Sequence, residues 1–387
     1  MSHSAAIVGI GETRVGKHPG RGILDLQGEA VRLALADAKM EKPDVHGLYT
    51  LGSYLNPLLM HGLSVAEYLG LRPRIQGNFD VGGTVAFMRM ACDAMAAIDN
   101  GEIEAAVCVY GDNASSRRVA GQHGFIRQVD QGTEEFEDPF GSTLVASYAL
   151  LARRYLDLHR IEAETAFWPI ALAMRENAKL NDNAAYRKTI TLEEYRASQM
   201  VAEPLRRLDC SPVVDGAGAF VIASKKRIDK LGLGGRAARL LGIGTQATHK
   251  IVSQTPDLDG LGMAEAGRRA MAQAGVSHSD VDLVTIHDGF TSSIAITLEQ
   301  LGFIKPGETG PRAAEGALGP KGDLPTNTHG GLISQGHVGG IMHVLEAVRQ
   351  LRGEAGARQV PNARVAAVTG NGNIFSSCGM MLLGKGL

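Results

Sequence analysis

The sequence has no cysteine pair spaced for a zinc site or a disulfide framework. Its cysteines, Cys92, Cys108, Cys210 and Cys378, lie far apart, and none belongs to a Cys-x-x-Cys motif. Isolated cysteines of this kind are typical of proteins in a reducing compartment. The chain also begins without the basic segment and apolar core of a secretory signal. We therefore expect a cytoplasmic protein with no bound metal.

Long apolar runs and an excess of one charge are missing as well. No apolar run approaches the roughly 20 residues that a membrane-spanning helix needs, so no membrane span is expected. The 39 Lys and Arg residues nearly balance the 41 Asp and Glu residues. Because proteins that bind nucleic acid usually carry a basic excess, we expect no nucleic-acid partner.

The chain does contain an internal repeat, within 387 residues that are enough for two domains. Segments 5–13 (AAIVGIGET) and 238–246 (ARLLGIGTQ) are both apolar stretches around a Gly-Ile-Gly. Segments 79–101 (FDVGGTVAFMRMACDAMAAIDNG) and 336–353 (GHVGGIMHVLEAVRQLRG) both place Val-Gly-Gly before an amphipathic helical pattern. The alternation of strands and helices predicts a parallel α/β fold, built from two duplicated halves whose central helices pack together.

The repeat sets the predicted domain boundaries. The first half spans residues 1–235 and the second spans residues 236–387, and residues of about 112–210 interrupt the pattern. The interruption is mostly helical by its apolar spacing, and we expect it to lie over the first half as a ligand-facing cap. The polar, glycine-edged segment 124–142 is expected to help shape the ligand pocket.

Four short blocks occur in order along this duplicated chain. They are CSPVVDGAGAFVIAS (210–224), IHDGF (286–290), NTHGGLISQGHVGG (327–340) and TGNGN (369–373). They resemble, in the same order, the Ser-x-x-x-Asp-Gly-Ala, Asn-Glu-Ala-Phe, Asn-x-x-Gly-Gly…Gly-His and Cys-x-Gly blocks of the thiolase superfamily. The His-Asp-x-Phe form of the second block resembles that of the sterol-carrier-protein (SCP2) branch. The resemblance extends over nearly the whole chain.

This resemblance implies both a fold and a chemistry. The fold has five layers, α-β-α-β-α, and usually forms a homodimer. Members of the family form or break a carbon–carbon bond beside a thioester carbonyl, so they stabilise an enolate with donors aimed at the thioester oxygen. We therefore expect a coenzyme A thioester as the substrate and no permanently bound cofactor.

His337 is the first candidate for such a donor. Its flanking glycines allow a sharp turn that brings the ring close to a substrate, and the resemblance makes it a donor to the thioester oxygen. His287 stands where the family has an asparagine that holds a water in the same oxyanion hole. Ser211 stands where a serine contacts the pantetheine arm of coenzyme A. The glycines expected to let the backbone approach the substrate are Gly339, Gly340, Gly370 and Gly372.

Each of these residues also has a structural interpretation. A histidine among glycines can simply occupy a turn, and a second histidine can satisfy a hydrogen bond of the core. Ser211 can be a turn residue ahead of Pro212. The glycines can serve tight helix–strand packing, alone or together with substrate approach. The sequence leaves these alternatives open.

The chain departs from the family at both catalytic cysteines. Alignment of the two halves places the nucleophile at Gly83 or Thr84, and a threonine nucleophile needs a dedicated base. Cys92, about two turns further along the helix, has the pattern of a small buried apolar residue. The family's acid/base cysteine aligns with Gly370, unless a register shift brings Cys378 into the site. Covalent acyl transfer therefore lacks its usual residues.

A retro-aldol cleavage of a β-hydroxyacyl-CoA passes through the same enolate and needs only a base for the β-hydroxyl. Some thiolase-like proteins that this chain resembles are aldolases that work with a small OB-fold partner of the DUF35 type. Candidate bases are Asp80, which the repeat pairs with His337, then Asp288 and Tyr110. A carboxylate base needs a pKa raised by burial, and Asp80 can instead cap the helix that follows it.

Three functions remain open from the sequence. The first is an enzyme that acts on acyl-CoA thioesters, by acyl transfer or by aldol cleavage. The second is a non-catalytic acyl-CoA or lipid-binding protein, which the missing cysteines favour. The third is a structural subunit for a catalytic or OB-fold partner. The retained Gly-His and His-Asp-Gly-Phe blocks favour the enzyme, because a protein that only binds has no need of an oxyanion hole.

Overall fold

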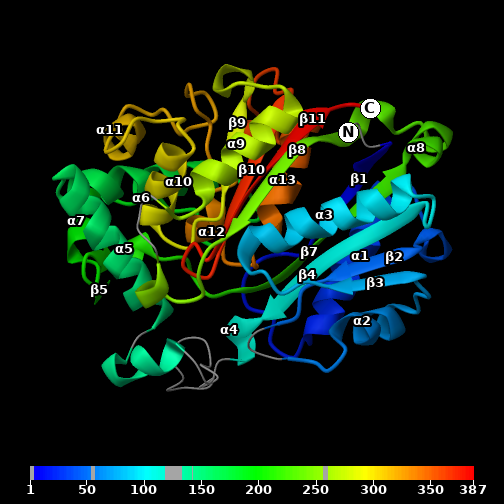
Figure 1. The fold of residues 1–387 in the computed structure, drawn as a ribbon, viewed down its shortest axis with the longest axis horizontal. Coiled ribbons are helices and arrows are strands. Elements are labelled where there is room, and N and C mark those ends of the chain that lie inside the picture. The colour runs from blue at the N-terminus through cyan, green and yellow to red at the C-terminus, as the bar shows by residue number, and fades with distance from the viewer. Residues whose placement is uncertain (1–3, 54–56, 118–132, 142, 256–259) are drawn as a thin grey trace.

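The computed structural model describes residues 4–53, 57–117, 133–141, 143–255 and 260–387. Among them, nine strands form one mixed sheet that runs through both halves of the chain (Figure 1). The strands of the first half are β1 (Ala5–Glu12), β2 (Gly47–Thr50), β3 (Ile75–Asn78), β4 (Ala105–Asn113) and β7 (Asp215–Ser224). Those of the second half are β8 (Ala238–Ala247), β9 (Leu283–Ile286), β10 (Val365–Gly372) and β11 (Ser377–Lys385). Their order is β3-β2-β4-β7-β1-β8-β11-β10-β9.

Each half of the sheet repeats the same arrangement. β2 runs parallel to β4, and β9 runs parallel to β10. β7 and β11 run antiparallel to their neighbours, so the expectation of a parallel sheet is wrong for these strands. The reason is plain for β11, because the short turn after β10 permits only antiparallel pairing and a parallel neighbour needs a long crossover. The halves join through β1 and β8, which share two residue pairs, Ala6 with Arg239 and Ile7 with Ala238.

The two halves of the sheet form two β layers, and the helices add three α layers. Together they confirm the expected α-β-α-β-α order. α1 (Ile23–Asp37) and α2 (His61–Leu69) cover one face of the first half, and α9 (Met263–Ala274) and α10 (Thr291–Gln300) cover one face of the second. α3 (Gly83–Asp99) and α13 (Ile341–Arg352) form the middle layer. These two helices contact each other and strands of both halves.

Alternation along the strands explains the middle layer. In β1, Ala5 and Ile7 belong to the apolar cluster around α3 and α13, whereas Ala6 and Val8 belong to the cluster under α1. The strand is thus apolar on both faces, as expected for a sheet covered on both sides. α3 is buried along most of its surface, because a helix between two layers of sheet has little contact with solvent.

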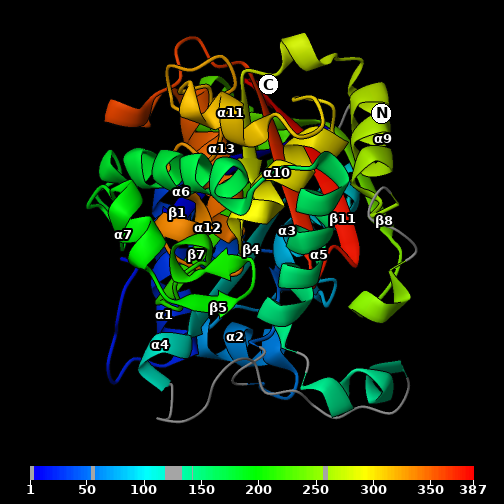
Figure 2. The same cartoon turned by 90° about the vertical axis from the view of Figure 1, so that its left-hand side faces the viewer.

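The described part of the insertion contains α4 (Ala114–Arg117), α5 (Leu144–His159), α6 (Ala163–Lys179), α7 (Leu192–Ala197) and the hairpin of β5 (Met200–Ala202) and β6 (Leu205–Arg206). α5 packs against α10, and α6 packs against α10, α11 (Thr309–Ala314) and α12 (Gly331–Ser334) (Figure 2). These helices belong to the second half, so the expectation that the cap lies over the first half is wrong. The apolar faces of α5 and α6 are part of the second half's core cluster.

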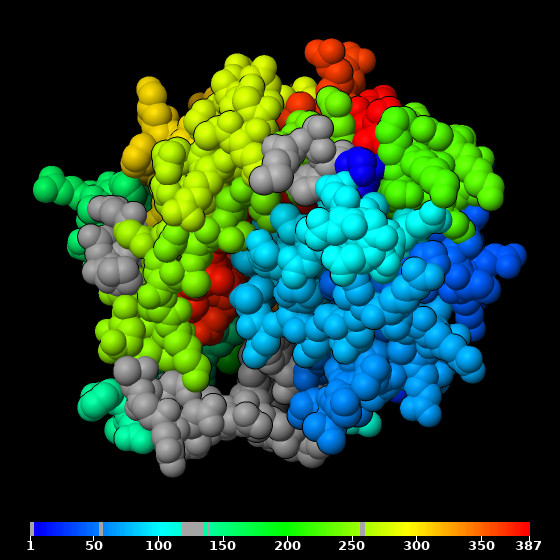
Figure 3. All heavy atoms as spheres, turned by 45° about the vertical axis from the view of Figure 1, so that its right-hand side comes forward, coloured from blue at the N-terminus to red at the C-terminus, as the bar shows by residue number. Residues whose placement is uncertain are grey.

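The polar segment expected to shape the pocket cannot be placed in full. Residues 124–132 and 142 of that segment lie outside the described residues. The two halves are connected through α8 (Lys225–Leu231), which follows β7 directly. On one face the molecule is hollowed between the blue and cyan atoms of the first half and the yellow-green atoms that begin the second (Figure 3). In the described part of the chain, every helix is too short or too polar to cross a membrane.

Candidate active site

The candidate site lies where the two central helices begin. The Val-Gly-Gly turns before them have positive φ angles, 72° and 51° at Gly82 and Gly83, and 59° and 91° at Gly339 and Gly340. A Cβ atom at Gly83 would lie only 1.8 Å from the backbone oxygen of Asn371. Glycine is therefore required for the start of α3 to come this close to the end of β10.

Thr84 is the first side chain after the turn, and it is fully buried. Its Oγ1 lies 3.0 Å from Nδ1 of His287 and 3.3 Å from the backbone oxygen of Gly340. A Cβ atom at Gly340 would lie 2.2 Å from the same Oγ1, so the two helix starts meet at Thr84. A buried hydroxyl held between two neighbours is poorly placed to attack a substrate, and Gly83 has no side chain. The structure therefore supplies no nucleophile at the position expected for one.

Two histidine rings meet edge to face at the candidate site. The ring centroids of His287 and His337 are 5.5 Å apart, and the ring planes meet at 87°. His287 is 7% exposed and His337 is partly exposed. Burial, together with the neighbouring His337, lowers the pKa of His287 to about 3, and burial also lowers the pKa of His337. Both rings are thus neutral at pH 7, and a neutral imidazole still donates one N–H.

The segment that contains Ser211 lies between the loops of these two histidines. The backbone N–H of Ser211 donates to the oxygen of Gly289 at 2.9 Å, and that of His337 donates to the oxygen of Pro212 at 3.2 Å. The structure thus brings Ser211 to the candidate site, where the sequence placed it. Its neighbour Val213 is 46% exposed, so this segment lies at the surface of the site.

Asp288 is buried and bound to the backbone of α12. Its carboxylate is fully buried and accepts the backbone N–H groups of Leu332 at 2.7 Å and Ile333 at 3.4 Å. Oδ1 also lies 3.5 Å from Nε2 of His343. Burial raises the pKa of Asp288 to about 8. These contacts make Asp288 a link between the His-Asp-Gly-Phe loop and α12, in place of the base that the sequence suggested.

Tyr110 is the candidate base that the structure places best. A Cβ atom at Gly339 would lie 2.4 Å from Cε1 of Tyr110, so the ring packs directly on the second Val-Gly-Gly turn. The Tyr110 hydroxyl donates to Oδ2 of Asp112 at 3.2 Å, and the Ser53 hydroxyl donates to the same oxygen at 2.9 Å. Burial raises the pKa of Asp112. Asp112 was not expected from the sequence, although it lies two residues from Tyr110 on the same face of β4.

Asp80 is exposed, in contrast to His337, its partner in the repeat. The N-cap residue of α3 is Gly82. Asp80 therefore does not occupy the N-cap position of this helix. The physical reason is the glycine turn, which inserts two residues between Asp80 and the first helical residue.

The remaining predicted glycines pack against the start of α3. A Cβ atom at Gly370 would lie 2.7 Å from Cβ of Thr84, and one at Gly372 would lie 2.4 Å from the oxygen of Val81. Tight packing therefore accounts for both glycines.

Three side chains that the sequence did not single out hold His287 in place. The Asn327 side chain accepts the N–H of Ile286 at 2.7 Å and donates to its oxygen at 3.0 Å. Asn371 donates to the oxygen of His287 at 3.2 Å, and its Oδ1 accepts the Tyr148 hydroxyl at 2.7 Å. Both asparagines lie in the matched blocks, so the blocks were a usable signal. Tyr148 comes from cap helix α5, whose apolar spacing gave no hint of this contact.

Cys378 and Cys92 both lie in apolar surroundings. Cys378 is fully buried on β11, where its Sγ donates to the oxygen of Leu261 at 2.8 Å. Cys92 is partly buried and packs against the central core cluster. Burial raises the pKa of both thiols, which disfavours the thiolate that a nucleophile needs. The register shift that would have brought Cys378 into the site does not occur.

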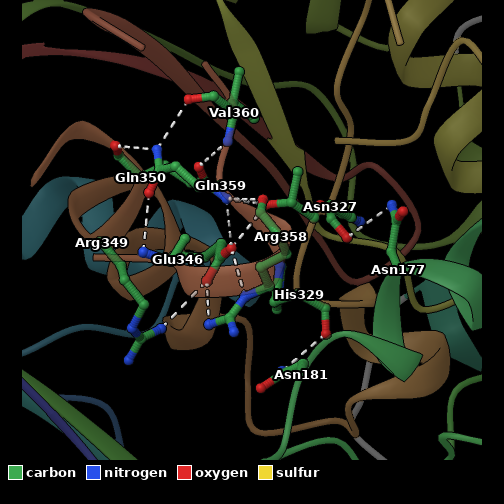
Figure 4. Close-up of polar contacts among 12 residues, drawn as sticks. Asn177, Asn181, Asn327, His329, Glu346, Arg349, Gln350, Arg358, Gln359 and Val360 are labelled. Carbon is green, nitrogen blue, oxygen red and sulfur yellow. Dashed lines mark hydrogen bonds and ion pairs between the residues drawn. The ribbon is translucent and has the colours of Figure 1, made fainter. Parts of the chain in front are cut away.

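A buried ion network supports the site from behind (Figure 4). Glu346 of α13 is fully buried and receives two hydrogen bonds of 3.0 Å from Arg358 and one of 3.2 Å from Arg349. Its Oε1 also accepts the Thr328 hydroxyl at 2.8 Å. The network therefore ties α13 to the block that carries Asn327. Within the described ranges, no three His, Cys, Asp or Glu side chains gather in a way that could hold a metal ion.

Comparison with known proteins identifies the class. Residues 244–385 match the family model described as thiolase C-terminal domain-like. The chain is 35% identical over 362 residues to 17-hydroxy-3-oxo-4-pregnene-20-carboxyl-CoA lyase of Mycobacterium tuberculosis, which covers 91% of this chain and 92% of the relative. The chain belongs to the thiolase superfamily, as an SCP2-type member.

Two further relatives differ in the reaction that their names state. An acetyl-CoA acetyltransferase of Methanothermobacter thermautotrophicus is 31% identical over 93% of this chain and 94% of its own. A solved structure described as Ltp2-ChsH2(DUF35) aldolase superposes with a TM-score of 0.86 at 30% identity, covering 99% of this chain and 98% of that chain. The similar proteins thus include both thiolase-type transferases and carbon–carbon lyases.

Proposed function

We propose that this protein is a retro-aldolase that cleaves β-hydroxyacyl-CoA thioesters into a carbonyl compound and a shorter acyl-CoA. The observation that carries the proposal is the pair of adjacent histidine rings, His287 and His337, beside a helix start with Gly83 and Thr84 and no cysteine. Such a site stabilises an enolate but has no group to accept an acyl chain. The similarity to a steroid-CoA lyase and to an aldolase structure supports the same reaction.

The proposed reaction balances within the site. A base takes the proton of the β-hydroxyl, the bond between the α- and β-carbons breaks, and its electron pair forms the enolate of the thioester. The β-carbon becomes the carbonyl of the first product. Ring N–H groups of His287 and His337 donate to the enolate oxygen as its charge develops. The α-carbon then takes the proton back, which completes the acyl-CoA product.

Tyr110 is the base that we propose for this step. As it accepts the hydroxyl proton, its own proton passes to Asp112, whose carboxylate lies 3.2 Å away. Burial raises the pKa of Asp112, which brings a carboxylate closer to the basicity needed near neutral pH. Replacement of Tyr110 by Phe is expected to lower kcat about 100-fold or more. Unchanged kcat in Tyr110→Phe would exclude Tyr110 and leave the rest of the proposal standing.

We propose two protein partners, each on a separate ground. The described sheet ends at β3, an edge strand with alternate residues exposed, and apolar side chains near it are exposed at Leu59, Met60, Leu63 and Val81. This edge fits a second copy of the chain. Light scattering is expected to give twice the chain mass of 40.9 kDa. An OB-fold protein of the DUF35 type is the second partner, by analogy with the aldolase structure.

The test measures cleavage directly. The purified protein, alone and with a ChsH2-type DUF35 protein, is incubated with 17-hydroxysteroid-20-carboxyl-CoA and with simple 3-hydroxyacyl-CoA thioesters. We expect ketone or aldehyde and acyl-CoA in equal amounts, and loss of both in His337→Ala. His278→Ala, at an exposed histidine of the second half, is the matched control and is expected to remain active.

Acetyl transfer and plain binding are the two outcomes that would replace the proposal. Formation of acetoacetyl-CoA from acetyl-CoA, with an acyl group trapped on the protein, would establish a thiolase. Tight binding of acyl-CoA without cleavage and without deuterium exchange at the α-carbon would establish a binding protein. Parallel incubations, one with acetyl-CoA and one with acyl-CoA in heavy water, are analysed by mass spectrometry to tell these outcomes apart.

A further inference from the structure

The two nitrogens of a histidine ring do different chemistry, because only the one that carries hydrogen can donate to a substrate. We infer that Thr84 is a positioning residue that holds His287 in the tautomer with hydrogen on Nε2, so that the ring donates to the thioester oxygen. The role in the reaction rests on the proposed function. The tautomer itself is a property of the protein without substrate.

The distances around Thr84 indicate the direction of its hydrogen bond. Its hydroxyl has one hydrogen and two acceptors in range, Nδ1 of His287 at 3.0 Å and the oxygen of Gly340 at 3.3 Å. The Gly340 oxygen already accepts the backbone N–H of His343. Nδ1 has no other partner among the described hydrogen bonds. We therefore infer that the Thr84 hydroxyl donates its hydrogen bond to Nδ1. Because Nδ1 then acts as an acceptor, the hydrogen of the neutral ring lies on Nε2.

The surroundings keep the Thr84 side chain from turning away. It is fully buried in the first turn of α3. Two glycines pack closely on this side chain. A Cβ atom at Gly340 would lie 2.2 Å from Oγ1 of Thr84, and one at Gly370 would lie 2.7 Å from Cβ of Thr84. A β-branched side chain in a helix also has few χ1 rotamers. Its hydroxyl therefore stays directed at His287.

Other contacts fix the place of His287 without touching the ring nitrogens. Its backbone N–H donates to the oxygen of Thr369 at 3.2 Å, and its oxygen accepts from Asn371 at 3.2 Å. Among the described hydrogen bonds, Thr84 makes the one that involves the ring. Removal of the Thr84 hydroxyl should thus change the tautomer while leaving the position of the ring.

The opposite tautomer would have the opposite effect. With hydrogen on Nδ1, the ring would donate to Thr84, Thr84 would donate to Gly340, and Nε2 would present a lone pair. A lone pair repels an enolate oxygen, whereas a donor in such a site accelerates the reaction by roughly 10²–10³. A base would gain from the lone pair, but burial lowers the pKa of His287 to about 3, and a group so hard to protonate is a poor base.

Long-range ¹H–¹⁵N NMR on protein labelled with ¹⁵N-histidine reads the tautomer directly. Loss of one resonance pair in His287→Gln assigns the signals. At pH 7 we expect hydrogen on Nε2 in the wild type and in Thr84→Ser, which keeps the hydroxyl. In Thr84→Val we expect a mixture or the Nδ1–H form. Hydrogen on Nδ1 in the wild type would overturn the inference, as would an unchanged Nε2–H form in Thr84→Val.

Kinetics of the same variants test the consequence. Thr84→Val is expected to lower kcat for cleavage about 10–100-fold with KM within about 3-fold, while Thr84→Ser stays within about 3-fold of wild type. A merely structural role would change thermal unfolding and leave the NMR tautomer as it is. A shifted tautomer with wild-type kcat would overturn the donor role. If wild-type protein cleaves no thioester, the proposed function fails, and the NMR result still decides the inference.

Discussion

The two Val-Gly-Gly helix starts share a sequence and a backbone shape but carry different side chains. Before α3 the turn follows exposed Asp80, and before α13 it follows His337. β2 is followed by Leu51, whereas β9 at the matching place is followed by His287. Inside the helices, half-exposed Arg89 on α3 matches buried Glu346 on α13. The comparison teaches that duplication supplied a symmetric frame and that the two histidines proposed as enolate donors belong to the second half.

Substitution at the paired positions Asp80 and His337 is expected to give the largest difference in activity. His337→Ala should lower cleavage and deuterium exchange at the α-carbon about 10²–10³-fold, because a donor to the developing enolate is lost. Asp80→Ala should stay within about 3-fold, because this residue lies at the exposed start of the turn. Cleavage by both variants is measured as kcat/KM. Equal losses in the two variants would mean that Asp80 also takes part in the reaction.

The paired positions Arg89 and Glu346 should differ in stability. Glu346→Gln leaves Arg358 and Arg349 without their buried carboxylate partner, and breaking such a pair costs about 3–5 kcal/mol. Arg89→Ala loses a half-exposed pair with Asp93, which is worth about 0–1 kcal/mol. Urea unfolding measures both. A loss below 1 kcal/mol in Glu346→Gln would contradict the importance of the network.

The same network predicts acid resistance for Glu346. Burial alone would raise the pKa of Glu346, but the charges of Arg358 and Arg349 hold it well below its usual range. A carboxylate with a lowered folded pKa adds stability above its unfolded pKa, and this stability is lost as pH falls through the folded value. The advantage of wild type over Glu346→Gln should therefore persist at pH 5 and fade only in strong acid.

Asp288 should give a pH dependence of the opposite sign. Burial raises its pKa to about 8, so the folded state holds a proton that the unfolded state loses near pH 4. Stability is then lost as pH rises from about 4 to about 8 and levels off above that. Asp288→Asn should flatten this slope in thermal unfolding. Asp182→Asn, at an exposed carboxylate, should follow wild type, and an unchanged slope in Asp288→Asn would contradict the assignment.

The sequence was sufficient for the two duplicated halves and for the neighbours of the site. The repeat predicted the two halves because matched strands and helices carry matched spacing, and the order of the blocks brought His287, His337 and Ser211 together. Buried glycines were correctly tied to helix starts, since few other residues tolerate positive φ. Local patterns of this kind survive in a single sequence.

Contacts between distant segments could not be predicted in the same way. The apolar spacing of α5 and α6 shows that each helix has a face to bury but does not say against what, so the cap was assigned to the wrong half. Tyr148 reads as an ordinary apolar position, although its hydroxyl reaches Asn371. Asp288 resembled a base because only the fold reveals that α12 begins beneath it. The chemistry of the site depends on these contacts between distant segments.

The position of α3 in the middle layer has a consequence for how the protein is made. This helix is completed early in translation, but strands β10 and β11, which it contacts, come at the end of the chain. At roughly 5–20 residues per second, its apolar surface waits tens of seconds for its cover. The nascent first half is therefore a natural client for a chaperone. Either half expressed alone should aggregate, whereas the two halves co-expressed as separate chains should not.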